Sequence, residues 1–328
     1  AIAGAEVAQR RGVHDARVWR PQGARFVGIE TRTIAVGTRG SALARRQTEL
    51  IMDLLRERFP GITLQMVTVQ TEADRVQDLP LSQFGDKGVF VRAIERALLD
   101  GEVDLAVHSL KDVPSDVETP GLALVAFSAR ADPRDVLISQ RGERLKDLPA
   151  GSRVGTSSLR RRVQLGAVRP DLVTVDIRGN VDTRLRKVRA GEYEAVILAA
   201  AGIDRLGLGT AITEYLPVET FLPDAGQGIM VVQGRVDDDA ADLARFIDSA
   251  ESRLVAHAER ALVRALGAGC QSPVGALATV EGDRLLLRGM AATEDLSRLC
   301  RAEERTEFDN AEMVGQRVAN RLLRSLAA

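Results

Sequence analysis

The sequence predicts an α/β protein with two α/β units followed by a smaller C-terminal α+β unit. Three observations support this fold class. Short β-branched runs alternate with helical patterns twice along the chain, as in βαβ units around mainly parallel sheets. With 328 residues the chain is longer than one core usually organises, so two or three domains are expected. Near residue 247 the alternation gives way to a long helix, a hairpin and a closing helix.

The first unit begins at Thr33. The runs TIAVG, ITLQMVTVQ and VDLAVHS are rich in β-branched residues and predict strands. Between them, SALARRQTELIMDLLRERF and GVFVRAIERALLDG carry apolar residues at helical spacing. Pro60 and Gly61 end the first of these helices, and Gly101 ends the second.

A second unit with the same alternation follows DPRD at 132–135. Its predicted strands are DVLIS, SRVGT, LVTVDI and YEAVILAAA. Its predicted helices are SSLRRRVQLGAV, which stops before Arg169 and Pro170, then NVDTRLRKVRAG and a short GIDRLGLG. The extended run LPDAGQGIMVVQGR, at 222–235, is expected to return the chain to the first sheet.

The third unit starts with the long helix DSAESRLVAHAERALVRALGAG. A hairpin around 281–283, a third strand in SRLCRAEERTEF and a closing helix over NAEMVGQRVANRLLRSLAA follow. We therefore divide the chain into four parts. These are an N-terminal extension (1–30), a first domain (31–130 with 229–246), a second domain (131–228) and a third domain (247–328).

Composition narrows the class of protein. A net charge of -1 and 3% aromatic residues argue against a nucleic-acid partner, and no apolar run is long enough to span a membrane. Two cysteines and three histidines argue against a disulfide framework and a metal site, and they fit a reducing compartment such as the cytoplasm. Residues 1–30 have no secretory signal pattern, so we expect a flexible extension. The alternative is a transit remnant, which would place the protein in a plastid.

Basic residues follow the C-terminal ends of the predicted strands. In open α/β sheets, ligands bind beyond these ends, where helix N-termini add N–H donors and positive potential. We therefore expect a cleft between the two α/β units that binds carboxylates or phosphates through arginine forks. The alternative for any single arginine is a solvated surface charge. The cations in question are Arg39, Lys111, Arg160, Arg161, Arg178, Arg184 and Arg205, and the accompanying hydroxyls are Ser41, Ser109, Thr156 and Ser158.

Two further residues stand apart from this pattern. Asp112, in HSLKDVP, places a carboxylate among the cations, which suits a positive charge that develops during a reaction, or a proton transfer. A structural pair with Lys111 is the alternative. Cys270 lies in the glycine-rich turn GAGCQSP, where a thiol could be a nucleophile, an attachment point or neither. His108 and Cys300 are expected to be packed strand residues.

At this point the residues match a known family. From about Thr33 to the C-terminus the chain resembles porphobilinogen deaminases, also called hydroxymethylbilane synthases. Nine motifs occur in order: GTRGSALA, FGDKGVF, DLAVHSLKDVP, DPRDVLIS, VGTSSLRRRVQL, IRGNVDTRL, LAAAGIDRLGL, LPDAGQG and GAGCQSPVG. The resemblance implies two domains with the fold of type II periplasmic binding proteins, a third domain that carries the cofactor, and a monomer.

The resemblance also implies the chemistry. A dipyrromethane cofactor would be bound to Cys270 through a thioether and would prime the stepwise addition of four porphobilinogen molecules, each losing ammonia. Hydrolysis would then release hydroxymethylbilane. Asp112 would lie against the pyrrole nitrogens, stabilise the azafulvenium cation formed on ammonia loss, and assist proton transfer. Cofactor and substrate contacts would come from Arg39, Ser41, Ser109, Lys111, Thr156, Ser158, Arg160, Arg161, Arg178, Arg184, Arg205 and Gln227.

The resemblance further implies a mobile loop over the site, at about 73–88, with Lys87 able to reach in. The family usually has two glycines before this lysine, and this chain has Gly85 and Asp86. Two other classes are considered. A solute-binding protein would need neither Asp112 nor Cys270, and a phosphate-handling transferase would normally carry a glycine-rich phosphate loop or metal carboxylates.

Overall fold

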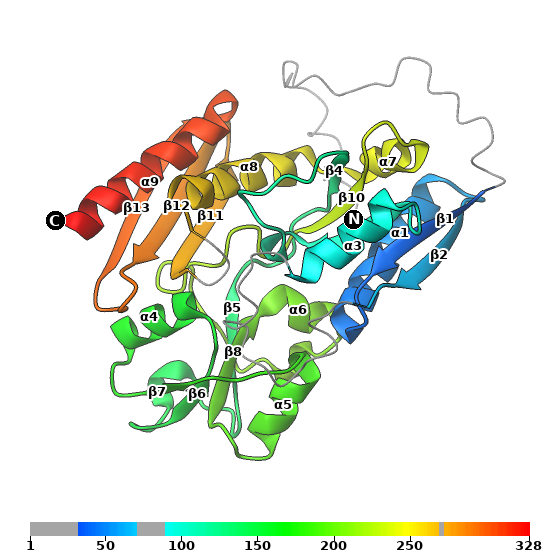
Figure 1. The fold of residues 1–328 in the computed structure, drawn as a ribbon. Helices are drawn as coiled ribbons and strands as arrows, with labels where there is room; N and C mark the ends of the chain where they lie inside the picture. The colour runs from blue at the N-terminus through cyan, green and yellow to red at the C-terminus, as the bar shows by residue number, and fades with distance from the viewer. Residues whose placement is uncertain (1–31, 71–88, 269–271) are drawn as a thin grey trace, which may run out of the picture.

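The computed structural model describes residues 32–70, 89–268 and 272–328, and within these ranges the chain forms three sheets (Figure 1). Two of the sheets are five-stranded and covered by helices. The third has three strands and lies beside two long helices. None of the helices in these ranges is both long enough and apolar enough to span a bilayer.

The first sheet has the strand order β2-β1-β3-β10-β4. Strands β1, β2 and β3 are parallel, and β10 is antiparallel to both of its neighbours. The strands are β1 (Thr33–Thr38), β2 (Thr63–Thr68), β3 (Leu105–Ser109), β4 (Leu122–Phe127) and β10 (Met230–Arg235). The associated helices are α1 (Ala42–Arg58), α3 (Val89–Leu99) and α7 (Asp239–Ala244), with short 3-10 turns η3 (Leu110–Asp112) and η6 (Arg245–Ile247).

The second sheet repeats this plan in the order β7-β6-β8-β5-β9, with β5 antiparallel to β8 and β9. Its strands are β5 (Asp135–Ser139), β6 (Arg153–Gly155), β7 (Val173–Val175), β8 (Ala195–Ala199) and β9 (Glu214–Tyr215). Its helices are α4 (Leu159–Val168), α5 (Val181–Arg189) and α6 (Ala200–Arg205), with 3-10 turns η4 (Leu145–Asp147) and η5 (Gly209–Ala211).

The third sheet is an antiparallel meander, β11-β12-β13. Gly282, with φ +64, turns the hairpin between its first two strands. The elements are β11 (Val274–Glu281), β12 (Arg284–Ala292) and β13 (Leu299–Glu307), with α8 (Ala250–Ala265), η7 (Phe308–Asn310) and α9 (Ala311–Ala327). Cys300 lies half-buried in β13, as expected.

Two crossovers, 128–134 and 216–229, join the first two sheets and run side by side. The Ala131 amide donates to the Gly228 carbonyl at 3.1 Å, and the Ser128 amide donates to the Met230 carbonyl at 2.8 Å. Gly228 has a φ of +93, and a Cβ there would lie 2.5 Å from the Ala131 carbonyl oxygen. Only glycine allows the crossovers to approach this closely.

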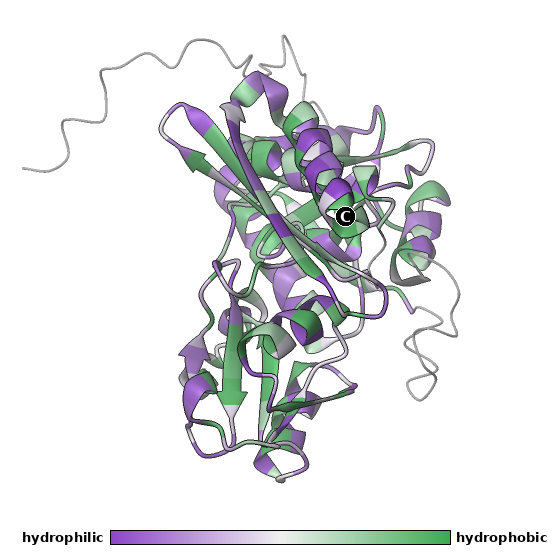
Figure 2. Cartoon of the chain, turned by 90° about the vertical axis from the view of Figure 1, so that its left-hand side faces the viewer, coloured by the Kyte–Doolittle hydropathy of each residue, from purple (hydrophilic) through white to green (hydrophobic). Residues whose placement is uncertain are grey.

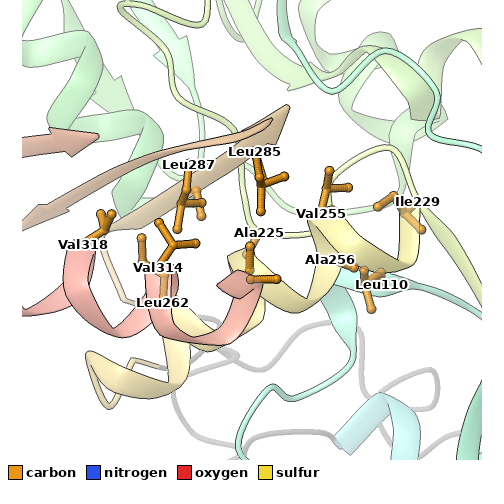
Figure 3. Close-up of a cluster of buried hydrophobic side chains, with 14 of the residues drawn as sticks. Leu110, Ala225, Ile229, Val255, Ala256, Leu262, Leu285, Leu287, Val314 and Val318 are labelled. Carbon is orange, nitrogen blue, oxygen red and sulfur yellow. The ribbon is translucent and has the colours of Figure 1, made fainter. Parts of the chain in front are cut away.

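As the sequence pattern predicts, apolar residues of the strands are buried in the core, and the polar faces of the helices lie outside (Figure 2). The largest buried cluster joins α8, α9 and the third sheet to two residues of the first unit (Figure 3). These are Leu110, in η3 after β3, and Ile229, just before β10. Leu110, in the turn that contains Lys111 and Asp112, therefore shares one buried core with α8 and the third sheet.

The hairpin and the return of 222–235 to the first sheet are confirmed. Mainly parallel sheets were expected, but each five-stranded sheet is mixed, with two parallel and two antiparallel pairings. The sequence analysis did not predict β4, β9 or α7. The predicted domain limits at 130/131 and 228/229 fall in the two crossovers, and the limit at 246/247 falls inside η6.

Candidate active-site cleft

A cavity of about 270 Å³ lies between the first two sheets, at the C-terminal ends of β1, β3 and β8. We refer to this cavity as the cleft. The structure brings nine of the predicted site residues to its lining: Arg39, Ser41, Ser109, Lys111, Asp112, Arg161, Arg184, Arg205 and Gln227.

Four predicted residues lie outside the described lining. Thr156 is buried, and its hydroxyl accepts a hydrogen bond from the Ser158 amide at 3.2 Å. Ser158 is the N-cap of α4, with its side chain accepting from the Arg161 amide. Arg160 is buried beneath the lining, and Arg178 is half-buried after β7. Ligand contacts by these four residues stay predictions. Lys87 and Cys270 lie outside the described residues.

The three consecutive arginines at the start of α4 have three different environments, because successive helical residues point about 100° apart. Arg160 donates to the Asp135 carboxylate at 2.8 Å and to the Leu222 carbonyl at 2.6 Å. Arg161 donates to the other Asp135 oxygen at 2.8 Å and also lines the cleft. Arg162 pairs with Asp176 at the surface. The arginine run therefore has one cation in the cleft, one behind it and one outside.

Asp135 is the counterion for the first two of these arginines, and the sequence analysis did not single it out. It opens β5 and is fully buried, and its carboxylate also accepts from the Gln227 side-chain amide at 2.9 Å. Burial favours the neutral acid, but Arg160 and Arg161 outweigh this effect and hold the Asp135 pKa well below its usual range. An acid at the head of the apolar run DVLIS was the available signal.

Lys111 is linked to the same network from the first sheet. Its Nζ donates to Gln227 Oε1 at 3.2 Å. Burial lowers the pKa of Lys111, and the Arg161 cation lowers it further. Asp112, Asp224 and Asp135 act in the opposite direction. A second carboxylate missed by the sequence analysis, Asp224, has its pKa raised by burial.

Arg184 and Arg205 are desolvated cations that form no ion pair within the described ranges. Arg184 Nε donates to the Gly179 carbonyl at 2.8 Å, and Arg205 donates to the Gly228 carbonyl at 2.6 Å. Burial lowers the pKa of each guanidinium to about 10, and Arg161 contributes to the shift at Arg184. Because neither charge is neutralised by a described carboxylate, a bound carboxylate would stabilise both.

Asp112 ends η3 and is exposed in the cleft. Buried neighbours, Leu110 and Val113, hold it on both sides, and the Leu110 amide donates to the Ile229 carbonyl at 3.0 Å. The turn is therefore anchored through Leu110 in the core of Figure 3, while Asp112 is exposed and lines the cleft. Of the described lining residues, five are Lys or Arg and two are acidic, Asp112 and Asp182.

His108 lines the cleft, and its ring forms a hydrogen bond with a residue of the neighbouring strand β10. Its Nε2 lies 3.0 Å from Gln233 Oε1, and the Gln233 amide donates to Glu95 at 2.8 Å. Since the Gln233 nitrogen is the donor to Glu95, its oxygen accepts from His108. Burial lowers the pKa of His108. These contacts agree with the expectation of a packed strand residue.

Comparison with known proteins identifies two matching family models. Residues 34–242 match the model described as porphobilinogen deaminase, dipyromethane cofactor binding domain, and residues 254–324 match porphobilinogen deaminase, C-terminal domain.

Relatives match across nearly the same length. Porphobilinogen deaminase from Roseiflexus sp. (strain RS-1) is 48% identical over 89% of this chain and 96% of its own. The enzyme of that name from Bordetella parapertussis is 48% identical over 91% of this chain and 94% of its own. Among solved structures, the methionine-binding protein MetQ aligns with a TM-score of 0.42 and 14% identity over 66% of this chain and 88% of its own.

Proposed function

The chain belongs to the porphobilinogen deaminase family, and from this premise we propose how its cleft carries the reaction. The enzyme is a transferase of tetrapyrrole biosynthesis. It adds four porphobilinogen molecules in turn to a covalently bound dipyrromethane, with loss of ammonia at each addition, and hydrolysis releases hydroxymethylbilane. The observation that carries the proposal is an exposed acid, Asp112, beside the five Lys and Arg side chains of the described cleft lining.

The cleft fits the dipyrromethane cofactor chemically. Each pyrrole ring of the cofactor and the substrate bears an acetate and a propionate. Arg184 and Arg205 are desolvated and have no described counterion, so they are suited to these carboxylates. The cofactor supplies a covalently held pyrrole at which the chain grows. We assign its attachment to Cys270, which lies outside the described residues.

Asp112 is proposed as the catalytic carboxylate. Ammonia loss leaves a positive charge on the substrate pyrrole, and an ionised carboxylate at that position lowers the energy of the transition state. The carboxylate can also take up the proton that the pyrrole ring loses when the new carbon–carbon bond forms. The surrounding cations cannot serve either purpose, because they repel the developing charge and are protonated.

The other cleft residues are proposed to bind carboxylates and orient the rings. Arg39, Arg161, Arg184, Arg205 and Lys111 would supply charge. The remaining assignments are Ser41, Ser109 and Gln227 in the lining, Thr156, Ser158, Arg160 and Arg178 around it, and Lys87 from the loop at 73–88. Binding several carboxylates explains why the basic residues concentrate locally in a chain whose net charge is -1.

The test is the mass of the intact denatured protein followed by peptide mapping. We expect an excess of one dipyrromethane on the peptide that contains Cys270. Protein with an unmodified mass is incubated with porphobilinogen and measured again. Acquisition of the adduct supports the proposal, and its absence together with a failure to consume porphobilinogen would refute it.

The remaining assignments are proposals of the same kind. We propose a monomer. We also propose the four-part division given above, and the strand membership of the three sheets supports its three domains. Residues 1–30, whether a flexible extension or a transit remnant, lie outside the described residues. The near-neutral charge and 3% aromatic content argue against a nucleic-acid partner. A cysteine that must stay reduced until the cofactor attaches supports the cytoplasm.

A further inference from the structure

We propose that Asp135 is a positioning residue that holds Arg161 and Lys111, one from each side of the cleft, in place for the carboxylates of the ligand. This inference rests on the proposed function of the cleft. Asp135 itself does not line the cleft, so it acts through its partners.

The first step of the argument is the bridge from the second sheet. Asp135 is fully buried at the start of β5, and Arg161 Nη2 donates to its Oδ1 at 2.8 Å. Arg161 Nη1 donates to the Ile197 carbonyl at 3.1 Å. Two anchored nitrogens fix the plane of the guanidinium, so the edge facing the cleft has a defined direction.

The second step is the bridge to the first sheet. Gln227 Nε2 donates to Asp135 Oδ1 at 2.9 Å and to the Pro133 carbonyl at 2.7 Å. With its nitrogen committed, Gln227 presents its oxygen to Lys111 Nζ at 3.2 Å. Asp135 thus selects the orientation of the amide that receives the lysine. These hydrogen bonds, from Asp135 through Gln227 to Lys111, lie where the two crossovers run side by side.

The third step is electrostatic. Arg160, Arg161 and Lys111 would be three neighbouring cations with little solvent, and Asp135 is the carboxylate that hydrogen-bonds to two of them. A buried carboxylate that accepts hydrogen bonds from three donors stays ionised, and removing its charge would leave the two arginines without a counterion. Its partners lie 25, 26 and 92 positions away, so only the folded structure reveals these pairings.

The test compares Asp135→Asn with Asp176→Asn in the holoenzyme. Asp176 pairs with Arg162 on the same helix, but its side chain is 71% exposed, so it is a matched arginine–aspartate control. We expect Asp135→Asn to raise the KM for porphobilinogen by about tenfold to a hundredfold, the value of a lost charge-assisted hydrogen bond. We expect Asp176→Asn to leave KM unchanged.

The pH profile supplies a readout that a general loss of stability would not move. Four charged groups act on Lys111: Arg161 disfavours its protonated form, and Asp112, Asp224 and Asp135 favour it. We attribute the alkaline limb of kcat/KM to deprotonation of Lys111, so losing the Asp135 charge lowers the pKa of Lys111 and moves that limb to lower pH. Asp176→Asn should keep the wild-type limb.

A second variant covers the case in which Asp135→Asn does not fold. Gln227→Met leaves both arginine pairs and the Asp135 charge but removes the acceptor of the Lys111 Nζ hydrogen bond. Because that bond favours the protonated amine, we expect the alkaline limb to move in the same direction, to lower pH. Wild-type profiles in folded Asp135→Asn, or in Gln227→Met, would overturn the inference. A wild-type protein that neither carries dipyrromethane nor consumes porphobilinogen would instead refute the proposed function, so the two failures are distinguishable.

Discussion

Replacing Asp112 by asparagine removes a negative charge from the cleft and nearly preserves the shape of the side chain. The developing positive charge on the substrate would lie at about 4 Å from this carboxylate. At that distance an effective dielectric constant of about 20 gives a stabilisation of about 4 kcal/mol, and bulk water gives about 1 kcal/mol. Since Asp112 is exposed in the structure but surrounded by desolvated cations, we place the loss at about 3–4 kcal/mol.

This free energy corresponds to a fall in kcat of about two to three orders of magnitude. The assay follows hydroxymethylbilane formation under steady-state conditions, and protein mass reports cofactor loading in the same sample. The KM should change little or fall, because the cations that bind the substrate carboxylates are retained and one acid that opposes them is lost. The circular dichroism spectrum and melting temperature should match those of the wild type.

Asp182→Asn is the control, since Asp182 is the other acidic residue in the described lining. If a general change in cleft charge slowed the reaction, both variants would be slow. We expect Asp182→Asn to keep kcat within about twofold of wild type. A fully loaded Asp112→Asn enzyme with kcat lowered less than about fivefold would refute the catalytic role, because that loss is no more than a solvated charge would give.

Three other predictions concern stability and cofactor uptake. Arg130→Leu leaves Glu259, which is fully buried and 2.5 Å from Arg130, without its cation, so unfolding should become easier by about 3–5 kcal/mol, measured by denaturant titration; a loss below about 1 kcal/mol would contradict this. Arg205→Gln removes a desolvated cation whose pKa is lowered to about 10, so the apoprotein should melt at or above the wild-type temperature while its rate of dipyrromethane uptake, followed by mass, falls about tenfold. A lower apoprotein melting temperature with normal uptake would show a structural role instead. Gly228→Ala forces the crossovers apart and should lower both the melting temperature and activity. The control Gly166→Ala, in open space within α4, should be neutral or stabilise the protein by up to about 1 kcal/mol. Equal effects of the two substitutions would contradict the close approach of the crossovers.

Much of the local structure could be predicted because it depends on neighbouring residues. The periodicity of SSLRRRVQLGAV predicts α4, and Pro170 predicts its end because proline disfavours helical backbone at the preceding residue, Arg169. The structure ends that helix at Val168. Strand β4, which has six residues, and strand β9 were missed. Their runs carry no alternation, and β9 has only two residues, paired with β5 by tertiary contact.

Some features of the candidate site could likewise be predicted from the sequence, and others could not. Ordered motifs and strand ends located the cleft, since the C-terminal ends of parallel strands must meet at one edge of a sheet. The sequence could not say which of three adjacent arginines would line the cleft. That depends on the direction in which α4 packs, which places Arg161 in the lining of the cleft, buries Arg160 behind it and leaves Arg162 at the surface.

The sequence by itself determined the order of helices and strands, the family and the concentration of cations at strand ends. Only the tertiary structure decided how those cations are neutralised. Asp135 and Gln227 are 92 positions apart and meet because the two crossovers run side by side. A buried charge takes its partner from whatever the fold brings within about 3 Å, and that choice is made by packing between distant segments.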